Sequence, residues 1–173
     1  MKLSERLKPF SETQVADAAV ALLLKPTDDT FSLLFVKRVN RTTDPWSGQM
    51  ALPGGKREPN DKDLKQTVTR ETLEETNINL AHCRFLGTTR IEHSTPRPEM
   101  GIVPFVILLE HEPVIRLNEK ELEGYDWISL KELTKHRGTV RFSFGEFPAY
   151  LVDRRAIWGV TYRIVEDLLH TID

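Results

Sequence analysis

Apolar runs separated by turn-forming residues mark two short strands near the start of the chain. Residues 15–24 (VADAAVALLL) and 31–36 (FSLLFV) are apolar, and the segment KPTDDT between them combines a proline with paired aspartates. Short apolar runs bounded by such residues are typical of paired strands. The pattern therefore predicts a β-hairpin.

Residues 61–76 change to a helical pattern, because apolar residues are spaced through a charged segment that contains neither glycine nor proline. The apolar positions are Leu64, Val68 and Leu73. Asn60 or Asp61 is expected to cap the first turn, since short polar side chains accept hydrogen bonds from the amide groups there. Asn77 tolerates the left-handed backbone that often ends a helix.

Further strands are predicted at residues 83–91, 102–109 and 125–128, and a second amphipathic helix over residues 156–172. In this last segment the apolar residues at helical spacing are Ile157, Val160, Ile164, Leu168 and Ile172. The order of strands, helix, strands and helix predicts an α/β (α+β) fold with a mixed sheet between helices. The length of 173 residues suits a single domain over residues 1–173.

Charge argues against some partners, and cysteine content excludes some kinds of site. The 24 basic and 26 acidic side chains leave a formal net charge of −2, so no overall charge attracts nucleic acid or an anionic membrane. The single cysteine, Cys83, rules out an internal disulfide and a cysteine-based zinc cluster, and is expected in the core. No window approaches the roughly 20 apolar residues of a membrane span. We therefore expect a cytoplasmic protein that binds any phosphate-rich ligand locally.

Three carboxylates share one face of the predicted helix. Glu71, Glu74 and Glu75 stand at positions i, i+3 and i+4, where Cβ atoms are about 5–6 Å apart and each like-charged pair costs roughly 0.2–0.5 kcal/mol. The adjacent Arg70 alone cannot neutralise three acids. A hard divalent cation would relieve the repulsion, because Mg²⁺ accepts carboxylate oxygens and bridges phosphates. A solvated charged face is the alternative for this segment taken alone.

The surrounding segment, GGKREPNDKDLKQTVTRETLEETNI, resembles the Nudix box, G-x5-E-x7-R-E-U-x-E-E-x-G-U, where U is aliphatic. Three features differ from the pattern: Asp61 replaces the first glutamate, one extra residue precedes Arg70, and Asn77 replaces the last glycine. None of them removes a carboxylate from the helix face. The chain is identified as a member of the Nudix hydrolase family, which implies an α/β/α sandwich with a mixed central sheet.

Within this family, the chain resembles the branch of coenzyme A pyrophosphatases. That branch has a longer loop after the glycine turn, with two acids at positions that Glu58 and Asp61 match. The segments DPWSGQMALPGGK and AIWGVT are also similar to this branch. One arginine of the branch is out of register, because Thr43 and Asp44 occupy its place.

The resemblance implies a Mg²⁺-dependent pyrophosphohydrolase, with Mn²⁺ as a substitute metal, that acts on a nucleoside diphosphate linked to another group. The implied metal ligands are Glu71, Glu74 and Glu75. The implied catalytic residues are Glu74, Glu75, Arg70 and Glu121. Glu121 is the candidate for an extra glutamate that family members often supply from a distant loop, with Glu119 in reserve and surface charge as the alternative.

Substrate contacts are expected from the glycine turn and from nearby cations. The candidates are Arg38, Gly54, Gly55 and Lys56. The glycines permit close approach of a phosphate. Arg38 and Lys56 are expected to bind phosphate oxygens, and an exposed charge at the edge of the site is the alternative for each. Trp46, Phe105 and Trp158 are candidates for an apolar wall against a base or a pantetheine arm, and core packing is the alternative for each.

The sequence is compatible with several substrates and with one other class of function. Coenzyme A, ADP-ribose, a dinucleotide or dinucleoside polyphosphate and a nucleoside triphosphate are all candidate small-molecule partners. A non-catalytic Nudix nucleotide-binding module is the alternative to an enzyme, because a fold by itself does not determine activity. The near-neutral charge argues against nucleic acid as a partner, and a homodimer is left open.

Overall fold

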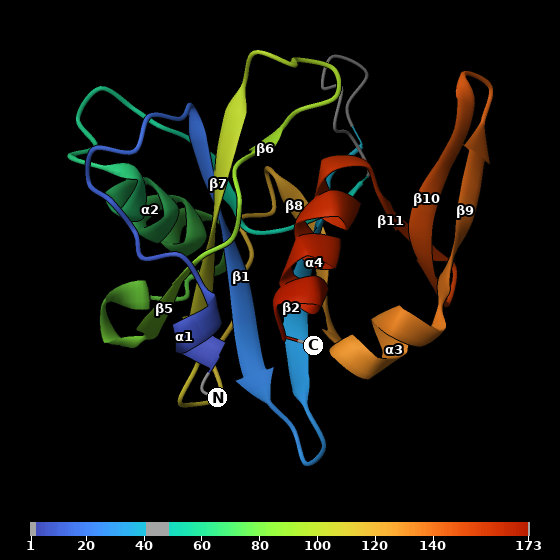
Figure 1. Cartoon of the computed structure of the whole chain (residues 1–173), viewed down its shortest axis with the longest axis horizontal. Helices are drawn as coiled ribbons and strands as arrows, with labels where there is room; N and C mark the ends of the chain where they lie inside the picture. The colour runs from blue at the N-terminus through green and yellow to red at the C-terminus, as the bar shows by residue number, and fades with distance from the viewer. Residues whose placement is uncertain (1–2, 41–48, 173) are drawn as a thin grey trace.

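The computed structural model describes residues 3–40 and 49–172, and Figure 1 shows a central sheet flanked by helices. Within these residues, the main path of the large mixed sheet runs β3-β2-β1-β7-β5. Its strands are β1 (Ala18–Pro26), β2 (Phe31–Arg38), β3 (Met50–Ala51), β5 (Arg84–Thr88) and β7 (Gly101–Leu108). The strands β4 (Gly54–Lys56), β6 (Glu92–His93) and β8 (Leu122–Ser129) pair with β1, β7 and β2.

The predicted hairpin is confirmed. β1 and β2 are antiparallel, with Leu24 opposite Leu33, and β1 runs parallel to β7, with Leu22 opposite Val106. β1 is buried on both faces, which explains why its sequence is a continuous apolar run instead of an alternating one. The strands predicted at 83–91, 102–109 and 125–128 are also present, as β5, β7 and β8.

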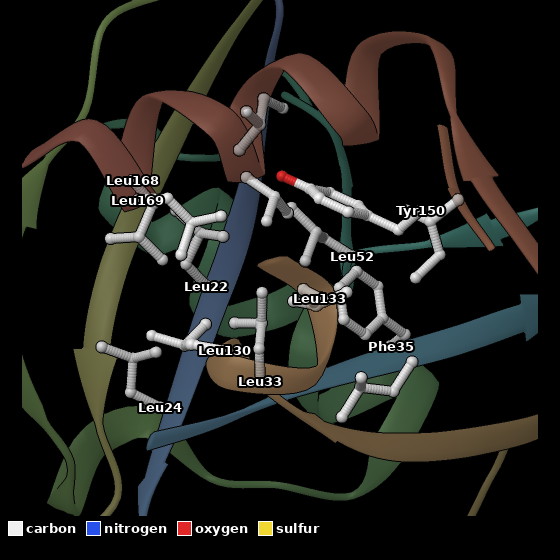
Figure 2. Close-up of a cluster of buried hydrophobic side chains, with 14 of the residues drawn as sticks. Leu22, Leu24, Leu33, Phe35, Leu52, Leu130, Leu133, Tyr150, Leu168 and Leu169 are labelled. Carbon is white, nitrogen blue, oxygen red and sulfur yellow. The ribbon is translucent and has the colours of Figure 1, made fainter. Parts of the chain in front are cut away.

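Two buried clusters, one on each face of the sheet, confirm the predicted α/β/α sandwich. Along β1, Leu23 belongs to the cluster that contains Val68 of α2 (Leu64–Thr76), whereas Leu22 belongs to the cluster that contains Leu168 of α4 (Gly159–Ile172). Figure 2 shows the α4-side cluster. Shorter helical segments are α1 (Leu3–Arg6), η1 (Leu80–His82) and α3 (Leu130–Lys135).

The helix α2 begins three residues later than predicted, at Leu64. Its N-cap is Asp63, whose carboxylate accepts a hydrogen bond of 2.8 Å from the Gln66 amide. Neither of the two predicted cap residues has this role. The prediction for the other end is confirmed, since Asn77 is left-handed, with a φ of 64°.

The C-terminal helix is also shorter than predicted. Residues Arg155–Trp158 form β11, and α4 begins only at Gly159, whose φ of 65° turns the chain from strand to helix. β11 pairs with β10 (Gly145–Val152), which pairs with β9 (Arg137–Phe142). This three-stranded sheet was not predicted. Residues 156–158 have helical spacing, but they form a strand because they pair with β10.

The unpredicted sheet is attached to α4 through a buried tyrosine. The Tyr150 hydroxyl of β10 donates a hydrogen bond to the Glu166 carboxylate of α4, and Arg137 Nε donates to the same oxygen at 2.8 Å. Figure 2 shows the Tyr150 hydroxyl pointing toward this helix. The contact holds β10 against the helix that follows β11. In the described part of the chain, no helix has the length and apolarity needed to cross a bilayer.

Candidate active site

A cavity of about 270 Å³ lies where α2, the glycine turn and the first turn of α4 approach the start of β1. It contains most of the residues predicted to form the site. The charged or glycine residues that line it are Arg38, Gly54, Gly55, Lys56, Glu71, Glu75 and Glu121. Of the predicted set, Arg70 and Glu74 do not line it. Apolar side chains, including Val20, Ile102 and Ile164, complete the wall.

Glu75 is the most buried acid of the cavity, with 3% of its surface exposed. Its Oε2 accepts a hydrogen bond of 2.9 Å from the Gly54 amide. Burial raises the pKa of Glu75 to about 8 against the effect of that hydrogen bond, and the carboxylates of Glu71 and Glu121 act in the same direction as burial. A cation in the cavity would therefore favour the ionised form of Glu75.

The glycine turn leaves space for a second carboxylate. A Cβ atom at Gly55 would lie 2.5 Å from the carboxyl carbon of Glu71, and one at Gly54 would lie 2.2 Å from the Ala19 carbonyl oxygen. Gly54 also has a φ of 146°, which side chains rarely allow. Gly54 is thus needed for the turn to pack against β1, and Gly55 leaves room for the Glu71 carboxylate.

Arg70 orients the acidic face of α2 from outside the cavity. Its Nε and Nη2 donate to the two carboxylate oxygens of Asp61 at 3.1 and 2.9 Å, and its Nη1 donates to Glu71 at 2.7 Å. The hydrogen bonds from Arg70 lower the pKa of the buried Asp61 to about 2, against the effect of burial. Asp61, expected as a helix cap, instead anchors the arginine that holds Glu71.

Glu74 does not line the cavity, although it shares Arg70 Nη1 with Glu71. Its side chain is 56% exposed and contacts Arg70 at 3.3 Å. Among residues 3–40 and 49–172, no group of three or more acidic, histidine or cysteine side chains is already arranged around one metal position. The structure therefore brings Glu71 and Glu75 into the cavity and leaves Glu74 outside it.

Glu121 reaches the cavity from the residue just before β8. Its Oε1 accepts a hydrogen bond of 3.1 Å from Asn118 Nδ2, and its carbonyl oxygen accepts one from the Val39 amide at 2.9 Å. The second bond ties this segment to the end of β2, next to Arg38. Glu119, the reserve candidate, is exposed and is not among the residues that line the cavity.

The predicted aromatic wall is only partly present. The prediction that Phe105 belongs to the wall is wrong, because this side chain is 1% exposed and packs against Phe10 and Phe85 on the α2 side of the sheet. Trp158 lines a second cavity, of about 260 Å³, with Phe144. Trp46 lies outside the described residues, as do Thr43 and Asp44. Cys83 is half-buried at the edge of the α2-side cluster.

The second cavity adjoins the first, since Gln49 and Val160 line both. Phe144 and Phe147 come from the β9–β10 hairpin, and both lie near the Trp158 ring, with centroid distances of 6.3 and 5.3 Å. Sequence reasoning missed these phenylalanines because it did not predict the hairpin. The alternation of aromatic residues in RFSFGEF was the available signal.

Comparison with known proteins agrees with this geometry. Residues 15–148 match the NUDIX domain family. An uncharacterized protein of Schizosaccharomyces pombe is 34% identical over 74% of this chain and 45% of its own length, so the chain spans less than half of that relative. The mouse mitochondrial coenzyme A diphosphatase is 29% identical over 87% of this chain and 75% of its own length.

A solved structure shows the same fold. The NUDIX domain of Shewanella oneidensis NrtR, determined with ADP ribose, has a TM-score of 0.61 and 15% identity, and the match covers 92% of this chain and 90% of that one. At this identity the likeness concerns the fold alone. The family match spans more than half of the chain and includes the glycine turn and the acidic helix. This protein therefore belongs to the Nudix hydrolase family.

Proposed function

We propose that this protein is a metal-dependent pyrophosphohydrolase that cleaves a diphosphate bond in a nucleoside diphosphate derivative, with coenzyme A as the first substrate to test. The observation that carries the proposal is the composition of the main cavity. Carboxylates of Glu71, Glu75 and Glu121 line the same space as the cations of Arg38 and Lys56. Acids suit a divalent metal, and cations suit phosphate oxygens.

The acids of the cavity fit Mg²⁺ or Mn²⁺. Glu71 and Glu121 both raise the pKa of Glu75, and Glu121 also raises the pKa of Glu71, because a nearby negative charge disfavours ionisation. Carboxylate oxygens are the preferred ligands of such hard cations. When bound, the metal would polarise the phosphates and lower the pKa of a water molecule. Glu74 would join the ligands only if its side chain left Arg70.

The residues of the chain then have separate roles in hydrolysis. The oxygen of water forms a bond to phosphorus while the bridging P–O bond breaks, and Glu121 is the candidate to accept the proton of that water. Arg38 and Lys56 would neutralise phosphate oxygens. Arg70 is a positioning residue, because it contacts Asp61 and Glu71 and does not line the cavity.

The choice of coenzyme A rests on two observations. The chain is 29% identical to a protein named as a coenzyme A diphosphatase. The aromatic cavity around Trp158 adjoins the main one and would accommodate the apolar part of a substrate that extends beyond the diphosphate. Apolar contacts discriminate between substrates by only about 1–3 kcal/mol, so ADP-ribose is the second compound to test.

We expect coenzyme A to be split at its diphosphate in the presence of Mg²⁺, because the cavity combines the metal-binding acids with an adjoining aromatic space. Mass spectrometry of the products checks this, since the expected pair is 4′-phosphopantetheine and 3′,5′-ADP. The panel also contains ADP-ribose, NADH, diadenosine polyphosphates and oxidised nucleoside triphosphates. Intact coenzyme A beside rapid hydrolysis of another compound contradicts the substrate, and no hydrolysis with either metal contradicts the enzyme.

Glu121→Gln is expected to lower kcat more than it raises KM, because a proton acceptor or late metal ligand acts mainly in the transition state. Steady-state kinetics on the best compound of the panel measure both constants. Glu119→Gln is the matched control: it makes the same chemical change two residues away, on an exposed side chain outside the cavity. Equal, small effects of the two changes would mean that the proton acceptor lies elsewhere.

A further inference from the structure

The first turn of α4 borders the same cavity as the carboxylates. Val160, Thr161 and Ile164 of this helix line the space that Glu71 and Glu75 also line. α4 has 14 residues, and its first turn contains no acidic side chain. A helix of this length has about half a positive charge at its N-terminus. The preceding residue, Trp158, has no side-chain oxygen that could accept hydrogen bonds from the first amide groups.

Thr161 adds an independent observation, because the residue is largely buried beside the cavity and its hydroxyl makes no hydrogen bond within the described residues. The residue is 8% exposed, and within residues 3–40 and 49–172 its side chain has no hydrogen-bond partner. Three fully enclosed hydroxyls in the described residues also lack a partner, those of Thr72, Thr89 and Ser94, and the Thr161 hydroxyl is not among them. Since Thr161 lines the cavity, its unused hydroxyl is available to a molecule bound there.

Three other helical threonines in this chain show where such a hydroxyl usually finds a partner, although Thr72 in the middle of α2 has none. The hydroxyls of Thr69, Thr76 and Thr171 donate to the carbonyl four residues earlier, at 2.8, 2.6 and 2.7 Å. Four residues before Thr161 is Ile157, which lies in β11. The left-handed Gly159 separates that strand from the helix. The usual carbonyl is therefore not in place, and the hydroxyl keeps its capacity for a ligand.

We propose that the Thr161 hydroxyl and the N-terminal amide groups of α4 form a subsite for phosphoryl oxygens of the diphosphate substrate. An anion is the ligand class, because helix N-termini and hydroxyl donors both favour negative charge. The inference rests on the proposed function and extends it. One phosphate lies on the side of Glu71 and Glu75, and oxygens of the other accept hydrogen bonds from α4.

The subsite also gives a chemical role to the segment AIWGVT. Its tryptophan borders the aromatic cavity, its glycine starts the helix, and its threonine supplies the hydroxyl. The aromatic cavity and the cavity that Thr161 lines share Val160, so an apolar contact and a phosphate contact would lie side by side.

Binding of inorganic pyrophosphate tests the subsite without any turnover. Thr161→Val keeps the shape of the side chain and removes the hydroxyl, and Thr161→Ser keeps the hydroxyl. By isothermal titration with pyrophosphate and Mg²⁺, we expect Thr161→Val to raise Kd about tenfold, the effect of one hydrogen bond to a charged group. Thr161→Ser is expected to bind as the unchanged protein does. Unchanged affinity in Thr161→Val overturns the inference.

A second measurement needs no variant and covers the case in which Thr161→Val does not fold. In the unchanged protein, the amide resonances of Val160 and Thr161 should shift when pyrophosphate is added, and unmoved resonances overturn the inference. These results are independent of the proposed activity. If no compound is hydrolysed but pyrophosphate binding depends on Thr161, the subsite stands and the activity is wrong. If coenzyme A is hydrolysed while Thr161→Val binds normally, the subsite is wrong.

Discussion

Glu75→Gln is expected to lower turnover on the best substrate by at least about 100-fold, because it removes charge that the transition state requires. Glu75 is the most buried acid of the cavity, and its carboxylate is held by the Gly54 amide. The amide oxygen of glutamine can accept the same hydrogen bond, so the turn should keep its conformation. Steady-state kinetics with Mg²⁺ measure the loss.

The free energy of unfolding should not fall in this variant. Burial and the neighbouring carboxylates raise the pKa of Glu75 to about 8, so its ionised form is disfavoured in the folded protein. Urea unfolding of Glu75→Gln and of the unchanged protein measures both free energies of unfolding. Glu112→Gln is the matched control, because this carboxylate is exposed, contacts Lys25 at 3.0 Å and does not line the cavity. Near-normal turnover in Glu75→Gln would refute the assignment of metal binding to this face of α2.

Gly55→Ala is the second change for which we expect a large loss, about 100-fold in turnover, the scale of a 1 Å misplacement at an active site. The added Cβ would lie 2.5 Å from the carboxyl carbon of Glu71. Since that carboxyl group is the end of a flexible side chain, it can move away. Glu71 would then leave its position in the cavity, while the backbone of the turn remains.

The matched control for this change is Gly124→Ala in β8, where an added Cβ would meet no atom within 4 Å. Both variants replace glycine by alanine in a strand, so their difference isolates the contact with Glu71. Melting temperature and turnover are measured together: Gly55→Ala should lose activity far beyond its loss of stability, and Gly124→Ala should lose neither. Full activity in Gly55→Ala would show that the position of Glu71 is not critical.

Local sequence patterns were sufficient for several parts of this fold. The β1–β2 hairpin follows from two apolar runs around a turn, and α2 follows from helical spacing without glycine or proline. The family resemblance also came from one contiguous segment. These features depend on neighbours within a few residues, where the sequence directly sets backbone preference and periodicity.

Helix spacing could not decide which two of the three α2 carboxylates enter the cavity. Successive residues are about 100° apart around a helix, so Glu71 lies between Glu74 on one side and Glu75 on the other. The glycine turn of β4 and the pairing of Arg70 with Asp61 settle this choice. Both contacts join α2 to residues that precede it in the chain, and helical periodicity contains no information about them.

The sequence by itself determined the β1–β2 hairpin, the strands β5, β7 and β8, the acidic helix, the glycine turn and the family. Only the tertiary structure decided which side chains share the cavity. Glu121 reaches it because the residues around β8 pair with β2, and Thr161 because Gly159 turns the chain out of β11. Phe105 is excluded because β7 buries it on the opposite face. The physical reason is that such a site depends on pairing between distant segments and on burial, which exist only in the folded chain.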